Sequence, residues 1–135
     1  MTFCRRAEIF NKKGDYEKEL EDLNQAMALN PKSSFGFNGA AWLYATCPKD
    51  EIRNGAKALE LANKACDLSN WKDFNVIDTL AAAEAENGKF DDAMKHQQQA
   101  ISSAQKAKTD EKTLAGMRAR LALYQQQKPY RDNGK

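Results

Sequence analysis

The sequence has few of the residues that mark disulfide frameworks, metal sites and membrane segments. It contains three cysteines (Cys4, Cys47 and Cys66), none of them in a C-x-x-C pair, and a single histidine, His96. An odd number of isolated cysteines is a poor disulfide framework and fits a reducing compartment. No apolar run approaches the ~20 residues that cross a bilayer, and the charged first dozen residues are unlike a signal peptide. These absences favour a cytoplasmic protein without a membrane segment.

The sequence also lacks a strong net charge. The formal charge is +2 over 135 residues, which favours neither nucleic acid nor a membrane surface as a partner. The charge is uneven, because residues 105–135 hold eight Lys or Arg against three Asp or Glu, a balance of +5. We interpret five of these cations as parts of the solvated faces of two helices. They are Lys106, Lys108, Lys112, Arg118 and Arg120.

Motifs for catalysis are missing as well. There is no Gly-rich phosphate loop, metal-ligand cluster or nucleophile motif. His96 lies four residues after Asp92, so we expect a surface pair between them. Cys47 reads as a small residue that ends a helix, and Cys66 as a buried small residue. The neighbouring Asp91 points about 100° away from Asp92 on a helix and forms no acid–base couple with it. The sequence therefore predicts no enzyme, no metal and no cofactor.

What the sequence does contain is helix-forming residues almost throughout. Ala, Leu, Lys, Glu and Gln dominate, and Val and Ile are rare. Breaks at Gly and Pro divide the chain into helical segments. The predicted helices cover about 2–13, 15–29, 33–46, 55–69, 73–87, 90–107 and 109–128.

Residues that favour helix ends support these boundaries. Asp15, Ser33 or Ser34, Asp73, and Thr109 or Asp110 can cap helix starts. Gly88 suits a helix end, and Pro129 is expected to end the last helix. In that helix an apolar stripe recurs at spacings of 3, 4 and 3, so this helix should pack on another element. The stripe is Leu114, Met117, Leu121 and Tyr124.

Two stretches of the sequence resemble each other. KGDYEKELEDLNQA (13–26) and NGKFDDAMKHQQQA (87–100) share a Gly, an aromatic two residues later and an Ala twelve residues later. The 74-residue separation accommodates two units of about 34 residues and an extra loop at CPKDEIRNG (47–55). Small residues recur seven apart in the middle unit as well, at Ala58 and Ala65.

With this period, turn and set of small residues, the chain resembles the tetratricopeptide repeat family. The stretches AWLYATCP, DTLAAAEAENGKFDDA and RLALYQQQKPYRD are similar to bacterial members, in which the Lys-Pro-Tyr-Arg end closes the array. Glu19 and Gln97 depart from the pattern. The resemblance implies an all-α, right-handed array of three helix hairpins in one domain, 1–131, with a capping helix. The implied units are about 1–33, 34–71 and 72–107, with the cap at about 109–128 and a tail at 129–135.

The resemblance also implies a binding groove, formed by the first helix of each unit. Its centre is aromatic and its ends are polar, which suits an extended peptide. The implied groove positions are Cys4, Glu8, Asn11, Lys12, Phe35, Asn38, Trp42, Thr46, Asn75, Asp78, Ala82 and Glu86. The alternative interpretation is that Trp42 and Phe35 belong to the core.

Within this family some grooves grip a carboxylate with Lys, Arg and Asn. The matching positions here carry no cation, so this mode is disfavoured. They are Cys4, Glu8, Gly39, Asn75 and Thr79.

Two functional hypotheses follow. The first is a non-catalytic module that binds a protein or peptide partner in the groove. The second is a structural or assembly element, forming a homo-oligomer or a longer array through apolar residues at its N-terminal end, Phe3, Ile9 and Phe10. We interpret the glutamine runs at 97–99 and 125–127 as solvated helix surface.

Overall fold

The structure is a computed structural model, and it describes residues 16–132. Within this range the chain is helical, with no strand, so the predicted all-α class is confirmed for the described residues. The expected helix at 2–13 lies outside this range. The helices are α2 (Tyr16–Leu29), α3 (Ser34–Thr46), α4 (Gly55–Leu68), α5 (Phe74–Glu86), α6 (Phe90–Lys106) and α7 (Glu111–Gln125).

Side-chain caps determine where most of these helices begin. Ser33, Asp73 and Asp110 each accept a hydrogen bond from a backbone N–H in the first turn of α3, α5 and α7, as predicted. Asn54 caps α4 in the same way. Lys89 makes no side-chain cap bond at α6, where acidic residues in the first turn favour the positive end of the helix dipole.

Four helices end with a residue in the left-handed conformation. This residue is Asn70 after α4, Gly88 after α5, Lys108 after α6 and Gln127 after α7. The next backbone N–H in each case bonds back to a carbonyl in the last turn, which is the Schellman arrangement. Pro129 was expected to end α7, and that prediction is wrong, because the helix ends at Gln125 and the turn at Gln127 precedes the proline.

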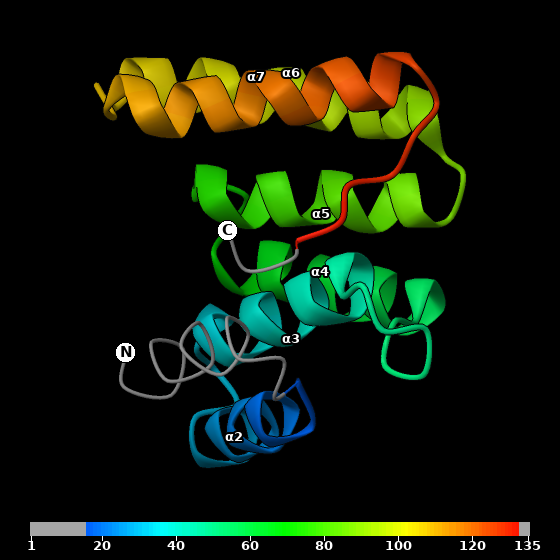
Figure 1. The fold of residues 1–135 in the computed structure, drawn as a ribbon. Helices are drawn as coiled ribbons and strands as arrows, with labels where there is room; N and C mark the ends of the chain where they lie inside the picture. The colour runs from blue at the N-terminus through cyan, green and yellow to red at the C-terminus, as the bar shows by residue number, and fades with distance from the viewer. Residues whose placement is uncertain (1–15, 133–135) are drawn as a thin grey trace.

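The helices stack in order along the chain. The pairs α3–α4 and α5–α6 pack most extensively, α5 also packs on α3 and α4, and α7 packs on α6. Figure 1 shows α2 at one end of the stack and α6 with α7 at the other. The chain then leaves α7 and runs back past α5 towards α3 and α4, so the last residues that the structure describes lie near the middle of the stack (Figure 1).

Small residues allow these helices to approach closely. Fully buried alanines occupy the contact faces of α4 and α6, as the repeat pattern predicts. A Cβ atom on Gly39 of α3 would lie 2.5 Å from a methyl group of Leu23 on α2, so any larger residue there would force the Leu23 side chain to move. The predicted stripe on α7 packs inwards, with Leu114, Met117 and Tyr124 buried and Leu121 half-buried.

Candidate functional site

Trp42 on α3 is the centre of the candidate site. It is half-buried, and it packs partly against the core. Its ring lies 5.6 Å from the ring of Tyr130, at an interplanar angle of 45°. Its Nε1 donates a hydrogen bond of 2.9 Å to Oδ2 of Asp132. Residues that follow the last helix therefore lie on the aromatic centre predicted from the sequence.

Arg120 of α7 holds these two rings together. Its guanidinium lies 5.4 Å from the ring centroid of Trp42 and 5.4 Å from that of Tyr130, within cation–π range. Its Nε and Nη2 donate to the two carboxylate oxygens of Asp78 at 3.1 and 2.9 Å. Burial lowers the pKa of Arg120, but the charge and hydrogen bonds of Asp78 outweigh it and leave that pKa above its ordinary value.

Glu86, at the end of α5, is a second anionic point on this face. Its carboxylate accepts a 2.6 Å hydrogen bond from Nη1 of Arg131 and lies 3.3 Å from Nε of Arg53. Arg53 also donates to the carbonyl of Cys47 at 2.8 Å, which fixes it at the end of α3. The carboxylate is therefore shared between a cation of the loop before α4 and a cation of the C-terminal residues.

A backbone contact completes the arrangement. The N–H of Asp132 donates to the carbonyl of Thr46 at 2.9 Å. Thr46 is buried, and its hydroxyl donates to the carbonyl of Trp42 at 2.7 Å. We call the surface formed by Trp42, Thr46, Asp78, Glu86 and Arg120 the inner face, and residues 126–132 the C-terminal segment. The inner face holds this segment by a tilted contact between two aromatic rings, an ion pair and a main-chain hydrogen bond.

Four of the five inner-face residues were predicted as groove positions: Trp42, Thr46, Asp78 and Glu86. Of the other predicted positions, Phe35 is 51% exposed, which excludes it from the core. Asn75 is exposed and Ala82 is buried. Asn38 is half-buried, and its Oδ1 has no hydrogen-bond partner. The remaining positions lie outside the described residues; they are Cys4, Glu8, Asn11 and Lys12.

Sequence reasoning missed Arg120, which was predicted to be solvated. That prediction is wrong, because its side chain is only 16% exposed and pairs with Asp78. A signal was available, since Arg120 lies three residues after Met117 and four before Tyr124, on the buried side of α7. Tyr130, Arg131 and Asp132 were assigned to a tail, although the resemblance implied that this end closes the array.

His96 and Gln97 also differ from their predicted roles. The Nδ1 atom of His96 lies 2.8 Å from Oε1 of Glu84 on α5, and not against Asp92. Burial raises the pKa of Glu84, and the hydrogen bond from His96 opposes that rise. Gln97 is fully buried, and its Nε2 donates to the carbonyl of Met117 at 2.9 Å. Both side chains face neighbouring helices because α6 is covered on two sides, by α5 and by α7.

The two described cysteines match their predicted roles. Cys47 caps the end of α3 and is buried, and Cys66 is buried in α4. Burial raises the pKa of the Cys66 thiol to about 12. A thiol with such a pKa is almost entirely protonated near neutral pH and is a poor nucleophile.

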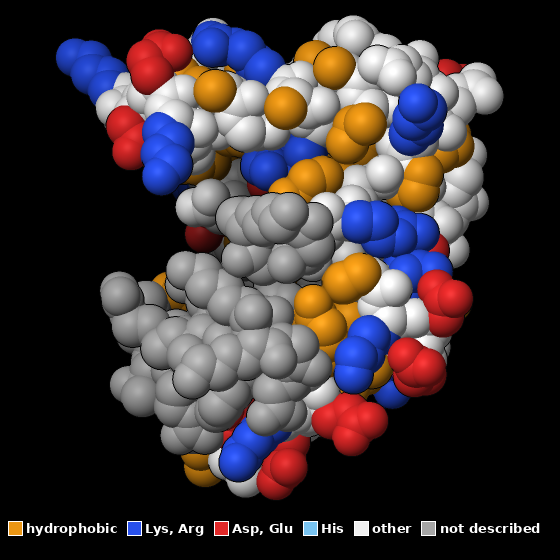
Figure 2. All heavy atoms as spheres, viewed as in Figure 1, with side chains coloured by type: hydrophobic (Ala, Val, Ile, Leu, Met, Phe, Trp, Pro, Cys, Tyr) orange, Lys and Arg blue, Asp and Glu red, His pale blue; other side chains and the backbone are white. Residues whose placement is uncertain are grey.

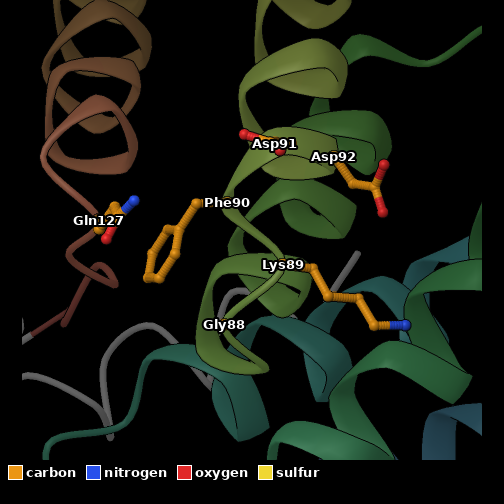
Figure 3. A pocket seen from close by; sticks show the side chains of 6 residues that line it. All are labelled: Gly88, Lys89, Phe90, Asp91, Asp92 and Gln127. Carbon is orange, nitrogen blue, oxygen red and sulfur yellow. The ribbon is translucent and has the colours of Figure 1, made fainter.

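A depression of about 550 Å³ lies between the start of α6 and the end of α7. Gly88, Lys89, Phe90, Asp91, Asp92 and Gln127 line it. Figure 3 shows Phe90 pointing towards Gln127, whereas Lys89 and Asp92 point to the other side. Phe90 packs on the cluster that contains Tyr124, so this aromatic fills space between helices. The depression is therefore a space left between two packed helices, and we do not assign it as a binding site.

Charged side chains of both signs lie on the face drawn in Figure 2. On the coloured part of the face in Figure 2, basic and acidic side chains are scattered among apolar and other ones, and neither sign forms a continuous patch. None of the helices in the described range is long and apolar enough to span a membrane. No family model, curated protein or solved structure matches this sequence. The inner face is therefore the feature from which a function can be argued.

Proposed function

We propose that this chain is a non-catalytic interaction module whose inner face binds an extended stretch of polypeptide. The observation that carries the proposal is the occupation of this face by the chain's own C-terminal segment. Three consecutive residues, 130–132, contact it through a ring, a cation and a carboxylate. A main-chain hydrogen bond to Thr46 adds a contact that any polypeptide could make. Aromatic and arginine contacts of this kind provide most of the energy in many protein interfaces.

A tetratricopeptide-like architecture is part of the same proposal. Its support is the 34-residue period, the close α3–α4 and α5–α6 pairs, and the buried alanines between them. In such an array α3 and α5 are the first helices of two successive units. The inner face draws Trp42 and Thr46 from α3 and Asp78 and Glu86 from α5, so it would lie on the surface where arrays of this kind bind partners.

The pairing of the charged groups favours binding over catalysis. Asp78 is engaged by Arg120, and Glu86 by Arg53 and Arg131. A general acid or base must exchange a proton with its substrate, which a carboxylate held by guanidinium groups does poorly. The same pairs suit a surface that presents fixed charges to a polar ligand.

A peptide selection tests this function. The bait is the full chain carrying Tyr130→Ser and Arg131→Ser, which we call the tail-disabled variant because its C-terminal segment loses its ring and its cation. Random peptides displayed on phage are selected on this bait and then tested against a bait that also carries Trp42→Phe, which removes the Nε1–H donor. We expect enriched peptides that bind the second bait more weakly.

The matched control is Trp71→Phe, which changes the other tryptophan, on the surface after α4. It should leave peptide binding unchanged. If no peptide is enriched on a folded bait, or if Trp42→Phe and Trp71→Phe have equal effects, binding on the inner face is excluded. Assembly through Phe3, Ile9 and Phe10 concerns residues outside the described range and stays a prediction, which sedimentation of the full chain would test.

A further inference from the structure

The C-terminal segment gives the order of chemical groups that the inner face recognises. Tyr130 and Asp132 both contact Trp42, while Arg131 between them reaches Glu86. This alternation is that of an extended chain, in which successive side chains point to opposite sides. Figure 1 shows the segment as an extended stretch across α5. The face therefore has an aromatic position, an anionic position and a donor position at fixed spacing.

The inner face keeps its charges paired when the segment leaves. Asp78 and Arg120 pair with each other, and Arg53 remains beside Glu86. Departure of the segment consequently leaves no buried charge without a partner. An unpaired buried charge would make release of the segment very costly. These groups belong to α5, α7 and the loop before α4, so their pairing does not depend on the segment.

The segment itself is attached in a way that permits exchange. Arg131 is 34% exposed, so water screens its pair with Glu86. The connection to α7 passes through Gln127, which has a φ of 59°. A residue other than glycine is strained in this conformation. That conformation belongs to the Schellman turn that ends α7, so movement of residues 130–132 away from the face leaves this turn in place and requires no helix to unfold.

We propose, resting on the function proposed above, that the inner face binds a partner polypeptide with an aromatic, a cationic and an acidic residue in consecutive order. Residues 130–132 occupy the same positions and compete with that partner. Tyr130 matches the Trp42 ring and the Arg120 guanidinium of the face, Arg131 matches the Glu86 carboxylate, and Asp132 matches the Trp42 Nε1–H. The ligand's two opposite charges also suit a face whose two carboxylates are already balanced, Asp78 by Arg120 and Glu86 by the neighbouring Arg53.

The test measures binding of a labelled peptide, KPYRDNGK, which is residues 128–135 of this chain. Fluorescence anisotropy is recorded with wild-type protein and with the tail-disabled variant. We expect the variant to bind about tenfold or more tightly than wild type, because an internal competitor lowers the fraction of competent molecules. A peptide of the same composition, scrambled so that Tyr, Arg and Asp are no longer adjacent, should bind neither protein.

Substitutions on the face identify the positions used. In the tail-disabled background, Glu86→Gln should weaken binding about two- to fivefold, the range for a partly exposed ion pair. Trp42→Phe should weaken it as well, and Trp71→Phe should not. Arg131→Ser alone serves as a milder variant if the double substitution lowers the melting temperature too far, and it should also bind the peptide more tightly than wild type.

Three results would overturn the competition proposal. One is equal affinity of the wild-type and tail-disabled proteins for the peptide, and another is equal binding of the scrambled peptide. The third is a wild-type dimer that the tail-disabled substitutions convert to monomers, since the occupant is then the segment of a second copy. Phage-selected peptides that need Trp42 but lack the aromatic–cation–acid order would refute only this inference and leave the proposed function standing.

Discussion

Replacing Asp78 by Asn should destabilise the protein strongly, because it leaves the guanidinium of Arg120 buried without a counter-charge. The two side chains are only 10% and 16% exposed, and two hydrogen bonds join them. The substitution keeps the size of the side chain and removes its charge. It also replaces one of the two carboxylate oxygens that accept hydrogen bonds from Arg120 by an NH₂ group, which cannot accept one. No cavity forms, so the change in stability reports on the electrostatic contact.

The magnitude follows from the burial of this pair. Removing one partner of a buried ion pair typically costs 3–5 kcal/mol, and the retained amide acceptor places the expected loss near ~3 kcal/mol. With a urea slope of ~2 kcal/mol per M for a domain of this size, the unfolding midpoint should fall by about 1.5 M. The assay is urea unfolding followed by far-ultraviolet circular dichroism.

A second ion pair on α7, the helix that carries Arg120, provides a matched control. Glu111 is 3.6 Å from Arg118, and both side chains are exposed, at 86% and 48%. Glu111→Gln should therefore lower stability by about 0.5 kcal/mol or less. Adding Arg120→Met to Asp78→Asn should recover much of the lost stability, because the stranded charge is gone. If Asp78→Asn and Glu111→Gln have equally small effects, the assignment of Asp78–Arg120 as a buried pair is refuted.

Three further predictions concern the backbone, the helix crossing and the buried thiol. Gln127→Gly should raise stability by about 1 kcal/mol in the same urea assay, since glycine adopts the positive φ without strain; a loss of stability would contradict the strain. Gly39→Ala should cost about 1–3 kcal/mol, because the added Cβ would overlap Leu23, and an unchanged midpoint would show that the α2–α3 crossing tolerates a methyl group. Cys66 should resist iodoacetamide at pH 8 in the folded chain. Its pKa is about 12 against an ordinary value of 9.0, so its contribution to stability is complete below pH ~9 and is lost as the pH rises towards 12. A Cys66→Ala variant that loses stability over the same alkaline range as wild type would argue against this thiol as a contributor.

The helices and most of their limits could be predicted from local sequence. Ser33, Asp73 and Asp110 cap the helices they were expected to cap, and Gly88 ends α5 in the left-handed conformation. These features involve hydrogen bonds between residues two to five apart, so a short stretch of sequence contains both partners. The end of α7 was missed because Gln127, a residue with a Cβ, takes the position that usually favours glycine.

The candidate site could be predicted only in part. Trp42, Thr46, Asp78 and Glu86 were implied by the resemblance to a repeat family, and each of them contacts Arg120 or one of residues 130–132. Their contacts with Arg53, Arg120 and residues 130–132 could not be predicted, because each joins residues 33 to 90 positions apart, from Arg53 and Glu86 to Trp42 and Asp132. Which of the cations near the C-terminus pairs with a buried carboxylate depends on the angle at which α7 crosses its neighbours, and spacing along the chain does not contain that angle.

The sequence by itself thus determined the helical class, the helix starts and the small residues at which helices approach, since all of these depend on local hydrogen bonds and side-chain size. The tertiary structure alone decided that Arg120 is paired, that Gln97 and His96 face other helices, and that Tyr130 and Asp132 lie on Trp42. Polar side chains have no periodic preference strong enough to reveal a distant partner. Such a pairing arises only when packing of the apolar faces brings the two groups together and removes the water between them.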